Sequence, residues 1–473
     1  MIVGELSYDE ESLMTAIAAA FAAKFAGIAI TPDHDGYDQA RAIWNGTVDA
    51  RPALIARCRT AEDIIAAVSL TRDAGLPLAV RGGGHSVPGL SMCDGGVVID
   101  LSLMRTVTVD PRHRIAVAEP GATWAGYDAA TAAHGLASTG GLISTTGVAG
   151  LTLGGGIGWL QRKHGLACDN LVAAEVVTAG GATVRASSQE NPHLLWGLRG
   201  GGGNFGIVSR FEFSLHPVST VLGGLMLFPL DDGQRVLRAF GDWAAQLPDE
   251  ASMMASVLTA PPEPFVPAEI VGHKVVGVAG CWCGDLDQGA AVLEPLRSLK
   301  PVIDVFSPMP YPALQQMLDG AAPPGLRNYF RGGYAAELSD DLIDVVLEHG
   351  ARMPSPMSAI DLHHMGGAVG RVGAGDTAFS GRAAAYTYNL RSTWTDPAED
   401  GQHISANRDV AAQLAPLSQD GSYVNFLTDT AGDSNAVVRA AYGDALYGRL
   451  ACLKREFDPG NLFRANHNVR PAH

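Results

Sequence analysis

Glycine is concentrated in three stretches of this chain, and no other sequence feature constrains the fold as strongly. The stretches lie at residues 81–86, 140–158 and 197–206, in a chain with 57 glycines among 473 residues. Glycine adopts positive φ at little steric cost and lets a backbone approach a ligand closely. Because no low-complexity repeat accompanies these glycines, they indicate tight turns and backbone–ligand contacts and not a linker. One stretch alone would be typical of turns, but three of them favour an extended cofactor that passes several loops.

The first stretch follows a predicted strand. The apolar run Leu78-Ala79-Val80 leads into Arg81-Gly82-Gly83-Gly84-His85-Ser86, and residues 52–58 and 60–74 before it predict a strand and a helix. Ligands of such β-α-β units lie beyond the carboxyl ends of the strands, and successive N–H groups in a glycine turn form a phosphate site. We therefore predict that this loop binds the phosphate of FAD and that His85 is bonded to the flavin. A lone histidine is more often an ordinary hydrogen-bonding residue, and its position after this loop is what favours the flavin bond.

Other short motifs do not support competing sites. Gly201-x-Gly203-x-x-Gly206 matches the dinucleotide fingerprint only formally, because it opens a predicted strand at residues 207–215 and not a helix. No P-loop motif is present. His363-His364 and Cys281-Trp282-Cys283 lack the further ligands that a metal site needs, so we expect no metal and interpret the cysteines as buried free thiols.

The composition is typical of a soluble globular protein with two or three domains, at 47% hydrophobic and 17% charged residues. The net charge of −16 argues against nucleic acid or an anionic membrane as a partner, because both need a basic surface. The first residues are acidic and do not resemble a secretory signal, and residues 13–25 predict an amphipathic helix. We therefore expect a cytoplasmic protein, and the sequence leaves its oligomeric state open.

The texture of the chain changes after Pro217. Residues 106–118 predict a hairpin, whereas residues 220–420 alternate strand-like and helical runs with few glycines, which predicts a sheet with helices on one face. The predicted strands of this second part include residues 224–229, 275–281 and 384–393. The predicted helices are residues 232–246, 285–298 and 340–353, with a further helix at residues 9–30 near the N-terminus.

Five segments then occur in one order along nearly the whole chain: residues 80–86, 146–158 and 200–208, Tyr423-Val424-Asn425-Phe426, and residues 453–463 followed by Asn466 and Asn468. In this order they resemble the berberine bridge enzyme-like oxidases of the vanillyl-alcohol oxidase superfamily, whose FAD-binding domain is of the PCMH type. The first segment resembles the family's histidyl-FAD loop, and the fourth resembles its active-site Tyr-x-Asn-Tyr motif.

The resemblance implies an α+β fold with a two-part FAD-binding domain. Its first part would be residues 1–218, with a core at 47–218, and residues 423–473 would return to it. Residues 219–422 would form the substrate domain, a mainly antiparallel sheet covered by helices. The resemblance implies that FAD is bound by His85 and by Arg81, Gly82, Gly83, Gly84, Ser86, Gly141, Thr145, Thr146, Gly147, Gly150, Gly154, Gly155, Gly156, Gly158, Gly206, Ile207, Val208, Asn425, Asn466 and Asn468.

One departure from the family pattern changes the predicted attachment of FAD. Many members bind the flavin a second time through a cysteine, and that position falls at or near Ile143 in this chain. The sequence has no cysteine between Cys93 and Cys168. We therefore predict a single covalent bond, through His85.

The resemblance also implies a reaction, in which a C–H next to an alcohol or amine is oxidised by hydride transfer to flavin N5. Such chemistry needs a base for the hydroxyl proton, and Tyr423 is the first candidate. Tyr386 and Tyr388 share one face of a predicted strand and are further candidates, with Arg382 as a source of positive charge, although tyrosines also simply pack in sheets. O₂ is the expected electron acceptor, giving hydrogen peroxide. The alternatives are a dehydrogenase with another acceptor, an NAD-dependent enzyme and a non-catalytic flavin-binding protein, and the small-molecule substrate is left open among alcohols, sugars and other secondary metabolites.

Overall fold

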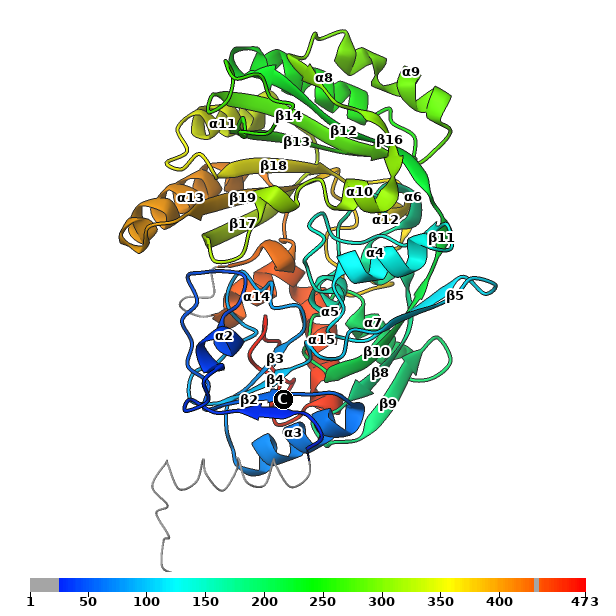
Figure 1. Ribbon diagram of the computed structural model, residues 1–473, viewed down its shortest axis with the longest axis vertical. Coiled ribbons are helices and arrows are strands. Elements are labelled where there is room, and N and C mark those ends of the chain that lie inside the picture. The colour runs from blue at the N-terminus through cyan, green and yellow to red at the C-terminus, as the bar shows by residue number, and fades with distance from the viewer. Residues whose placement is uncertain (1–24, 429–433) are drawn as a thin grey trace, which may run out of the picture.

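The computed structural model describes residues 25–428 and 434–473, which form two stacked parts (Figure 1). The lower part in Figure 1 contains two small sheets and the C-terminal helices, and the upper part is one large sheet covered by helices. The predicted α+β fold is therefore confirmed. The helix predicted at residues 9–30 lies mostly outside the described residues. Its end is instead strand β1 (Ile28–Ile30), because this segment pairs antiparallel with Ile55–Arg57.

The first small sheet carries the first glycine-rich loop. Its strands are β1, β2 (Leu54–Arg57), β4 (Val97–Asp100) and β3 (Leu78–Arg81), in that order, and β2, β4 and β3 run parallel. Helix α3 (Ala61–Asp73) connects β2 to β3 and begins at Thr60, whose side chain accepts from the Asp63 N–H in a capping box. The glycine loop begins where β3 ends, at the carboxyl edge of the parallel strands, as the sequence predicts.

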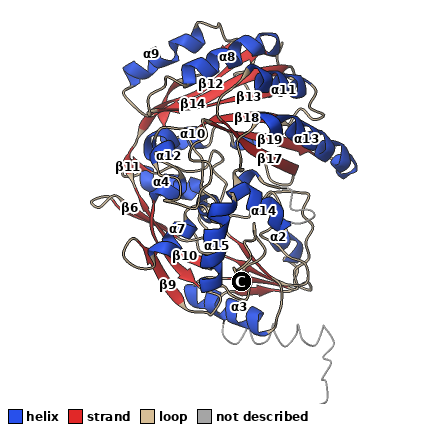
Figure 2. Cartoon of the chain, turned by 180° about the vertical axis from the view of Figure 1, so that it is seen from behind, coloured by secondary structure: helices blue, strands red, loops and turns tan. Residues whose placement is uncertain are grey.

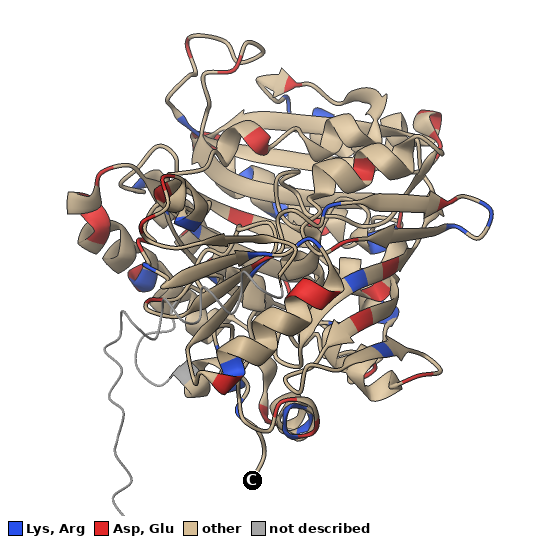
Figure 3. Ribbon diagram, turned by 60° about the horizontal axis from the view of Figure 1, so that its bottom comes forward, with Lys and Arg blue, Asp and Glu red and all other residues tan. Residues whose placement is uncertain are grey.

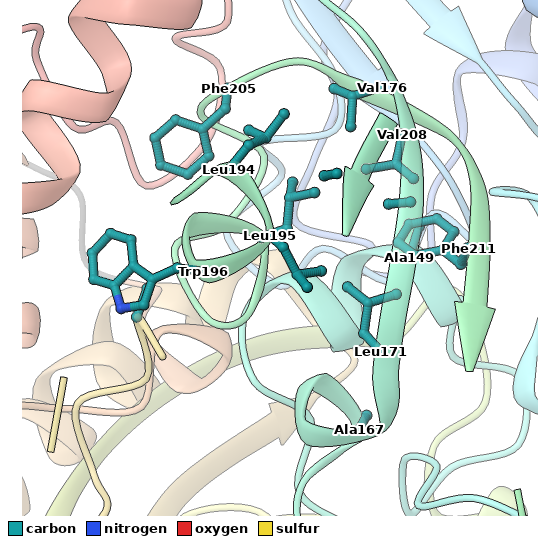
Figure 4. Packing of buried hydrophobic residues seen from close by; sticks show 14 of the residues in the cluster. Ala149, Ala167, Leu171, Val176, Leu194, Leu195, Trp196, Phe205, Val208 and Phe211 are labelled. Carbon is teal, nitrogen blue, oxygen red and sulfur yellow. The ribbon is translucent and has the colours of Figure 1, made fainter. Parts of the chain in front are cut away.

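The second small sheet is antiparallel, in the order β5 (Val107–Asp110), β6 (Ile115–Ala118), β10 (Ile207–Ser214), β8 (Leu171–Val177) and β9 (Thr183–Ser187). The predicted hairpin of residues 106–118 is confirmed as β5 and β6. Helix α7 (Pro192–Leu198) packs its leucines against this sheet, where Val208 and Phe211 of β10 are buried (Figure 4). The third glycine-rich stretch connects α7 to β10, so its position is fixed at both ends by this core.

The large sheet is built from long antiparallel strands. Its order is β15 (Ile303–Asp304), β12 (Thr220–Pro229), β14 (Lys274–Trp282), β13 (Ala251–Thr259), β18 (Ala359–His364), β19 (Tyr386–Trp394) and β17 (Arg327–Ala335), with β16 (Ser307–Pro310) beside β12. Helices α8 (Gly233–Ala244), α9 (Leu286–Arg297), α11 (Asp340–Ala351) and α13 (Asp400–Leu414) cover its outer face (Figure 2). All strands of this sheet fall within the predicted substrate domain, whose exact boundaries stay a prediction.

The two faces of the large sheet differ in character. On β19, Tyr386, Tyr388 and Leu390 face the helices and share a core with residues such as Phe240 of α8. The alternate residues Asn389 and Arg391 face the lower part of the molecule and line a cavity there. Since side chains alternate along a strand, one face of β19 is structural and the other is available for a site.

Short elements complete the described chain. The helices and strands are α2 (Tyr37–Arg41), α4 (Trp124–Ala132), β7 (Leu136–Ala137), α5 (Val148–Leu153), α6 (Gln161–His164), β11 (His216–Pro217), α10 (Tyr311–Gln315), α12 (Ala368–Arg371), α14 (Ser434–Tyr442) and α15 (Asp444–Phe457). Charged residues of both signs are interspersed over the molecule (Figure 3).

A buried ion pair joins the C-terminal segment to the third glycine-rich stretch. Lys454 and Asp458 on and after α15 are fully buried, with 2.7 Å between Nζ and Oδ2. Lys454 also donates to the carbonyl oxygens of Asn204 and Phe463, at 2.8 and 2.7 Å. The Asp458 carboxylate accepts from the N–H groups of Leu462 and Phe463. Because every donor of the ammonium is used, this network fixes the tail beside the glycine stretch.

Replacement of Lys454 by methionine is expected to lower the free energy of unfolding by about 3–5 kcal/mol, because it leaves the Asp458 carboxylate buried without its cation. Urea unfolding followed by circular dichroism measures this. The exposed neighbour Arg455 gives the matched control, since Arg455→Met is expected to change stability by only about 0.5 kcal/mol. Equal unfolding midpoints for K454M and R455M would contradict the role given to the ion pair.

Candidate active site

All three glycine-rich stretches line one cavity between the two parts of the molecule, together with the inner face of the large sheet and the C-terminal tail. This convergence brings together residues that are up to several hundred positions apart in the sequence. Among the residues predicted to bind cofactor or substrate, those that line the cavity are Gly82, Gly83, Gly84, His85, Ser86, Gly141, Thr146, Gly147, Gly150, Gly154, Gly206, Ile207, Val208, Tyr423, Asn425 and Asn466.

His85 lies at the cavity wall and is partly buried. Its ring stacks on Trp44, with 4.2 Å between the ring centroids and 16° between the planes. Its Nε2 atom is buried and has no hydrogen-bond partner among the described residues. Burial lowers the pKa of His85 to about 4, so the ring is neutral at pH 7. A neutral imidazole with an unused nitrogen has a free lone pair and can bond to a ligand in the cavity.

The loops around His85 and Gly147 pack backbone against backbone. A Cβ atom on Gly83 would lie 2.5 Å from the Cα atom of Gly147, and one on Gly147 would lie 2.6 Å from the amide nitrogen of Gly83. No side chain fits at either position without pushing the loops apart. Glycine is therefore required here for close approach of two chain segments, and this approach aligns the first two stretches along one wall of the cavity.

Tyr423 is buried, and three N–H donors surround its phenolic oxygen. The backbone N–H groups of Gly156 and Ile157 donate to it at 3.0 and 3.3 Å, and Asn425 Nδ2 donates at 2.8 Å. Burial still outweighs these donors and raises the pKa of Tyr423 to about 12, so the phenol keeps its proton at pH 7. Residues Val424–Phe426 form a 3₁₀ turn, η6, which places the side chains of Tyr423 and Asn425 side by side.

These features fit FAD. The cavity offers a buried unpartnered nitrogen on His85 and backbone surfaces at Gly150 and Gly203, where open space takes the place of a side chain. At its tail end, Asn466 Nδ2 donates to the Gly203 carbonyl at 3.1 Å and closes the third stretch against the C-terminal segment. Glycine-lined backbone of this kind suits a long cofactor that carries phosphates.

Comparison with known proteins identifies the family. Residues 52–187 match the family described as FAD binding domain, and residues 422–470 match the family described as berberine and berberine like. An FAD-linked oxidoreductase of Dictyostelium discoideum is 32% identical over 463 residues, which cover 97% of each chain. The chain belongs to the berberine bridge enzyme-like FAD-linked oxidoreductases.

Solved structures agree with this membership. The 6-hydroxy-D-nicotine oxidase of Arthrobacter nicotinovorans matches with a TM-score of 0.82 and 28% identity, covering 95% of this chain and 98% of that one. The glucooligosaccharide oxidase of Acremonium strictum matches with a TM-score of 0.84 and 25% identity, covering 97% and 99%. Its FAD is described as 6-S-cysteinyl and 8α-N1-histidyl. This berberine bridge enzyme-like protein is thus an FAD-dependent oxidoreductase.

Eight predicted site residues of this berberine bridge enzyme-like protein do not line the cavity. Tyr386 and Tyr388 point to the opposite face of the sheet, where the Tyr388 hydroxyl lies 2.8 Å from Ser418 Oγ. They are therefore not brought together with Tyr423, because a strand presents only alternate residues to one side. The other six are Arg81, Thr145, Gly155, Gly156, Gly158 and Asn468, of which Gly156 contributes its N–H to Tyr423.

The sequence suggested Arg382 as a source of positive charge for the candidate tyrosines Tyr386 and Tyr388, but the structure pairs Arg382 with a carboxylate instead. Its guanidinium is buried and forms a bidentate pair with the Asp169 carboxylate, at 2.7 and 2.5 Å. It also donates to Thr377 Oγ1 at 2.7 Å. Asp169 belongs to η1 (Ala167–Asn170). The ion pair therefore holds the segment before β19 against η1, although the two are far apart in the sequence.

The cavity face of the sheet carries polar residues that the sequence interpretation missed. Ser256 of β13, Asp361 of β18 and Asn389 of β19 lie directly opposite one another across neighbouring strands. His363 follows on the same face of β18. The signal was the polar pair Asp361 and His363 at a spacing of two, with apolar Ile360 and Leu362 at the alternate positions of the strand. It was overlooked because His363-His364 was weighed only as a metal site.

No cysteine lies near Ile143 in the sequence. Ile143 lines the cavity, and the next residue is held by Asp319 of η3 (Asp319–Ala321), which accepts from the N–H and hydroxyl of Ser144 at 2.7 and 2.6 Å. All six cysteines are among the described residues, and none of them lines the cavity. Within residues 25–428 and 434–473, no three metal-ligating side chains cluster and no helix is long and apolar enough to span a membrane.

Proposed function

We propose that this protein is an oxidase that carries FAD on His85 and oxidises a small alcohol or amine, with O₂ as the electron acceptor. The observation that carries the proposal is the buried and unpartnered Nε2 atom of His85, at the wall of a cavity that opens onto the polar face of a sheet. A nitrogen with no hydrogen bond in a dry site is costly unless a ligand uses it.

The residues of the cavity would divide between holding the cofactor and receiving the substrate. The glycine stretches, with Asn466 closing the third, would bind the cofactor, and the cavity face of the large sheet would receive the substrate. Bound FAD would take a hydride from the substrate carbon and pass the electrons to O₂. Tyr423 is protonated at pH 7 and its oxygen is fixed by three N–H donors, so its O–H would donate a hydrogen bond at the reacting end of the cavity.

The reactions for which relatives are named support this proposal. One is named as an oxidase of 6-hydroxy-D-nicotine and another as an oxidase of glucooligosaccharides, so the family includes small-molecule oxidases. The second relative bears both a cysteinyl and a histidyl flavin bond. Here Ile143 occupies the region where the second bond is expected, and we propose the histidyl bond alone.

The purified holoprotein tests the proposed function. Under anaerobic conditions, its visible flavin band is followed with a panel of alcohols, amines and sugars, and peroxide is then measured after air is admitted. Bleaching by a panel member, with one peroxide formed per flavin reoxidised, is the expected result. Bleaching without reoxidation by air would indicate a dehydrogenase, and flavin that bleaches only with dithionite would indicate a non-catalytic flavin-binding protein. A colourless protein that reduces NAD would contradict the flavin assignment altogether.

A further inference from the structure

The cavity face of the large sheet is divided into an apolar and a polar half. The strands β12, β14 and β13 present apolar side chains to the cavity, including Leu225, Leu227, Met254, Leu258 and Ala279. The polar half lies on β13, β18 and β19, and the edge strand β17 beyond it contributes both Asn328 and Phe330. A substrate that fills this space would meet apolar side chains over β12 and β14 and hydrogen-bonding groups toward β18 and β19.

Within the polar half, the charged groups satisfy one another. Asp361 accepts from Ser256 Oγ at 2.7 Å, and its second oxygen lies 3.3 Å from Arg391 Nε. Asp361 therefore serves as the counter-ion of Arg391, and its charge is not free to act on a ligand.

Two acceptor atoms of the polar half are left unused. His363 Nε2 and Asn389 Oδ1 are buried and have no hydrogen-bond partner in the described part of the chain, with the two residues only 6% and 3% exposed. Both residues line the cavity. Because buried polar atoms are normally paired, these two positions predict a ligand that brings O–H or N–H donors.

His363 is also in the right state to accept a proton. Burial lowers its pKa to about 4, with Asp361 acting to raise it and Arg391 to lower it, so the ring is neutral at pH 7. Met254 of β13, Thr387 of β19 and the Phe426 ring, with its centroid at 5.6 Å, are its other neighbours and do not titrate in this range. By contrast, Tyr423 would first have to lose its own proton to act as a base.

Resting on the proposed function, we propose that His363 and Asn389 form the subsite that binds the oxidisable O–H or N–H group of the substrate. His363 takes the proton of this group. The rest of the substrate is a compact apolar body, as in an aryl carbinol, and not a sugar. For a carbinol, the C–H bond breaks with its electron pair leaving as hydride to the flavin. The O–H proton passes to His363 Nε2, and the C–O bond becomes a carbonyl. A sugar has a hydroxyl on nearly every carbon, and the apolar half of the sheet would leave most of them unpaired.

The first experiment tests recognition without turnover. The probes are 2-naphthol and 2-methylnaphthalene, which are nearly equal in size but differ in one hydrogen-bond donor, and the readout is perturbation of the flavin band on titration. We expect 2-naphthol to bind the wild type at least tenfold more tightly than the second probe. This preference should fall in H363L, which keeps only the Asn389 acceptor, and disappear in the double variant H363L/N389L. Equal binding of the two probes by the wild type, or binding of neither, would overturn the donor subsite.

The second experiment tests the proton transfer, with 2-naphthylmethanol and cellobiose as reductants in anaerobic stopped flow. We expect the carbinol to reduce the flavin at a rate that is flat from pH 6 to pH 9, and H363N to be about 100-fold slower, as for loss of a general base. The neighbouring histidine faces the helices, near Arg162, so H364N is the matched control and should keep the wild-type rate and pH profile. A tenfold rise in rate per pH unit, or an unchanged rate in H363N, would contradict His363 as the base.

The outcomes separate this inference from the proposed function. Reduction by cellobiose but not by the carbinol would overturn the compact apolar substrate and leave an oxidase in place. If no compound of either class, nor any member of the wider panel, reduces a flavin that dithionite can reduce, the proposed function itself fails.

Discussion

Replacement of Tyr423 by phenylalanine is expected to slow reduction of the bound flavin by substrate about 10³-fold, because it removes a fixed hydrogen-bond donor at the reacting end of the cavity. The aromatic ring and its packing against Phe379 and Phe426 are kept. The flavin should stay attached, since the hydrogen bonds of the Tyr423 hydroxyl do not involve His85. Anaerobic stopped flow with the reductant found in the panel gives the rate.

The same change is also expected to lower the free energy of unfolding, which must be measured together with the rate. It leaves the N–H groups of Gly156 and Ile157 without their acceptor, at about 1–3 kcal/mol for each buried donor. Y388F is the matched control, because it removes a tyrosine hydroxyl from the helix-covered face of the sheet. A reduction rate within twofold of the wild type in Y423F, with Y388F the slower of the two, would contradict the placement of Tyr423 at the reacting end.

Removal of the His85 ring is expected to abolish covalent flavin completely. H85A removes the ring that would carry FAD on the first glycine-rich loop, and no cysteine among the described residues lines the cavity. We expect FAD to be released into the supernatant on acid precipitation, whereas wild-type protein keeps its yellow colour in the pellet. The loops should still fold, because the Gly83–Gly147 contact and the strand before them do not depend on the ring.

The cofactor side of the cavity was largely predictable from the sequence. Its recognition depends on backbone, and glycine spacing reports directly where a backbone must turn or approach another segment. Residues 82–86, 147, 150 and 206–208, to which the glycine stretches and the family resemblance assign the cofactor, all line the cavity. Some elements followed from local patterns as well, such as the hairpin of residues 106–118. Strand β1 did not, because its pairing with β2 decides its conformation.

The substrate side was not predictable, because alternation shows which residues share a face and not which face meets the cavity. On β19, Tyr386 and Tyr388 were predicted as candidate bases, yet they pack under helices. Asn389 and Arg391 face the cavity instead. On β18, the adjacent histidines point to opposite faces. Two of the three donors to Tyr423, the N–H groups of Gly156 and Ile157, lie more than 260 positions away, and no local pattern reports such a contact.

The most direct test of the account is mass spectrometry of the flavin-bearing peptide after proteolysis of the acid-precipitated wild-type protein. The account predicts a single flavin peptide, which contains His85, with FAD attached to that histidine and no flavin on any cysteine. FAD that dissociates entirely on precipitation, or a flavin peptide that lacks His85, would contradict it.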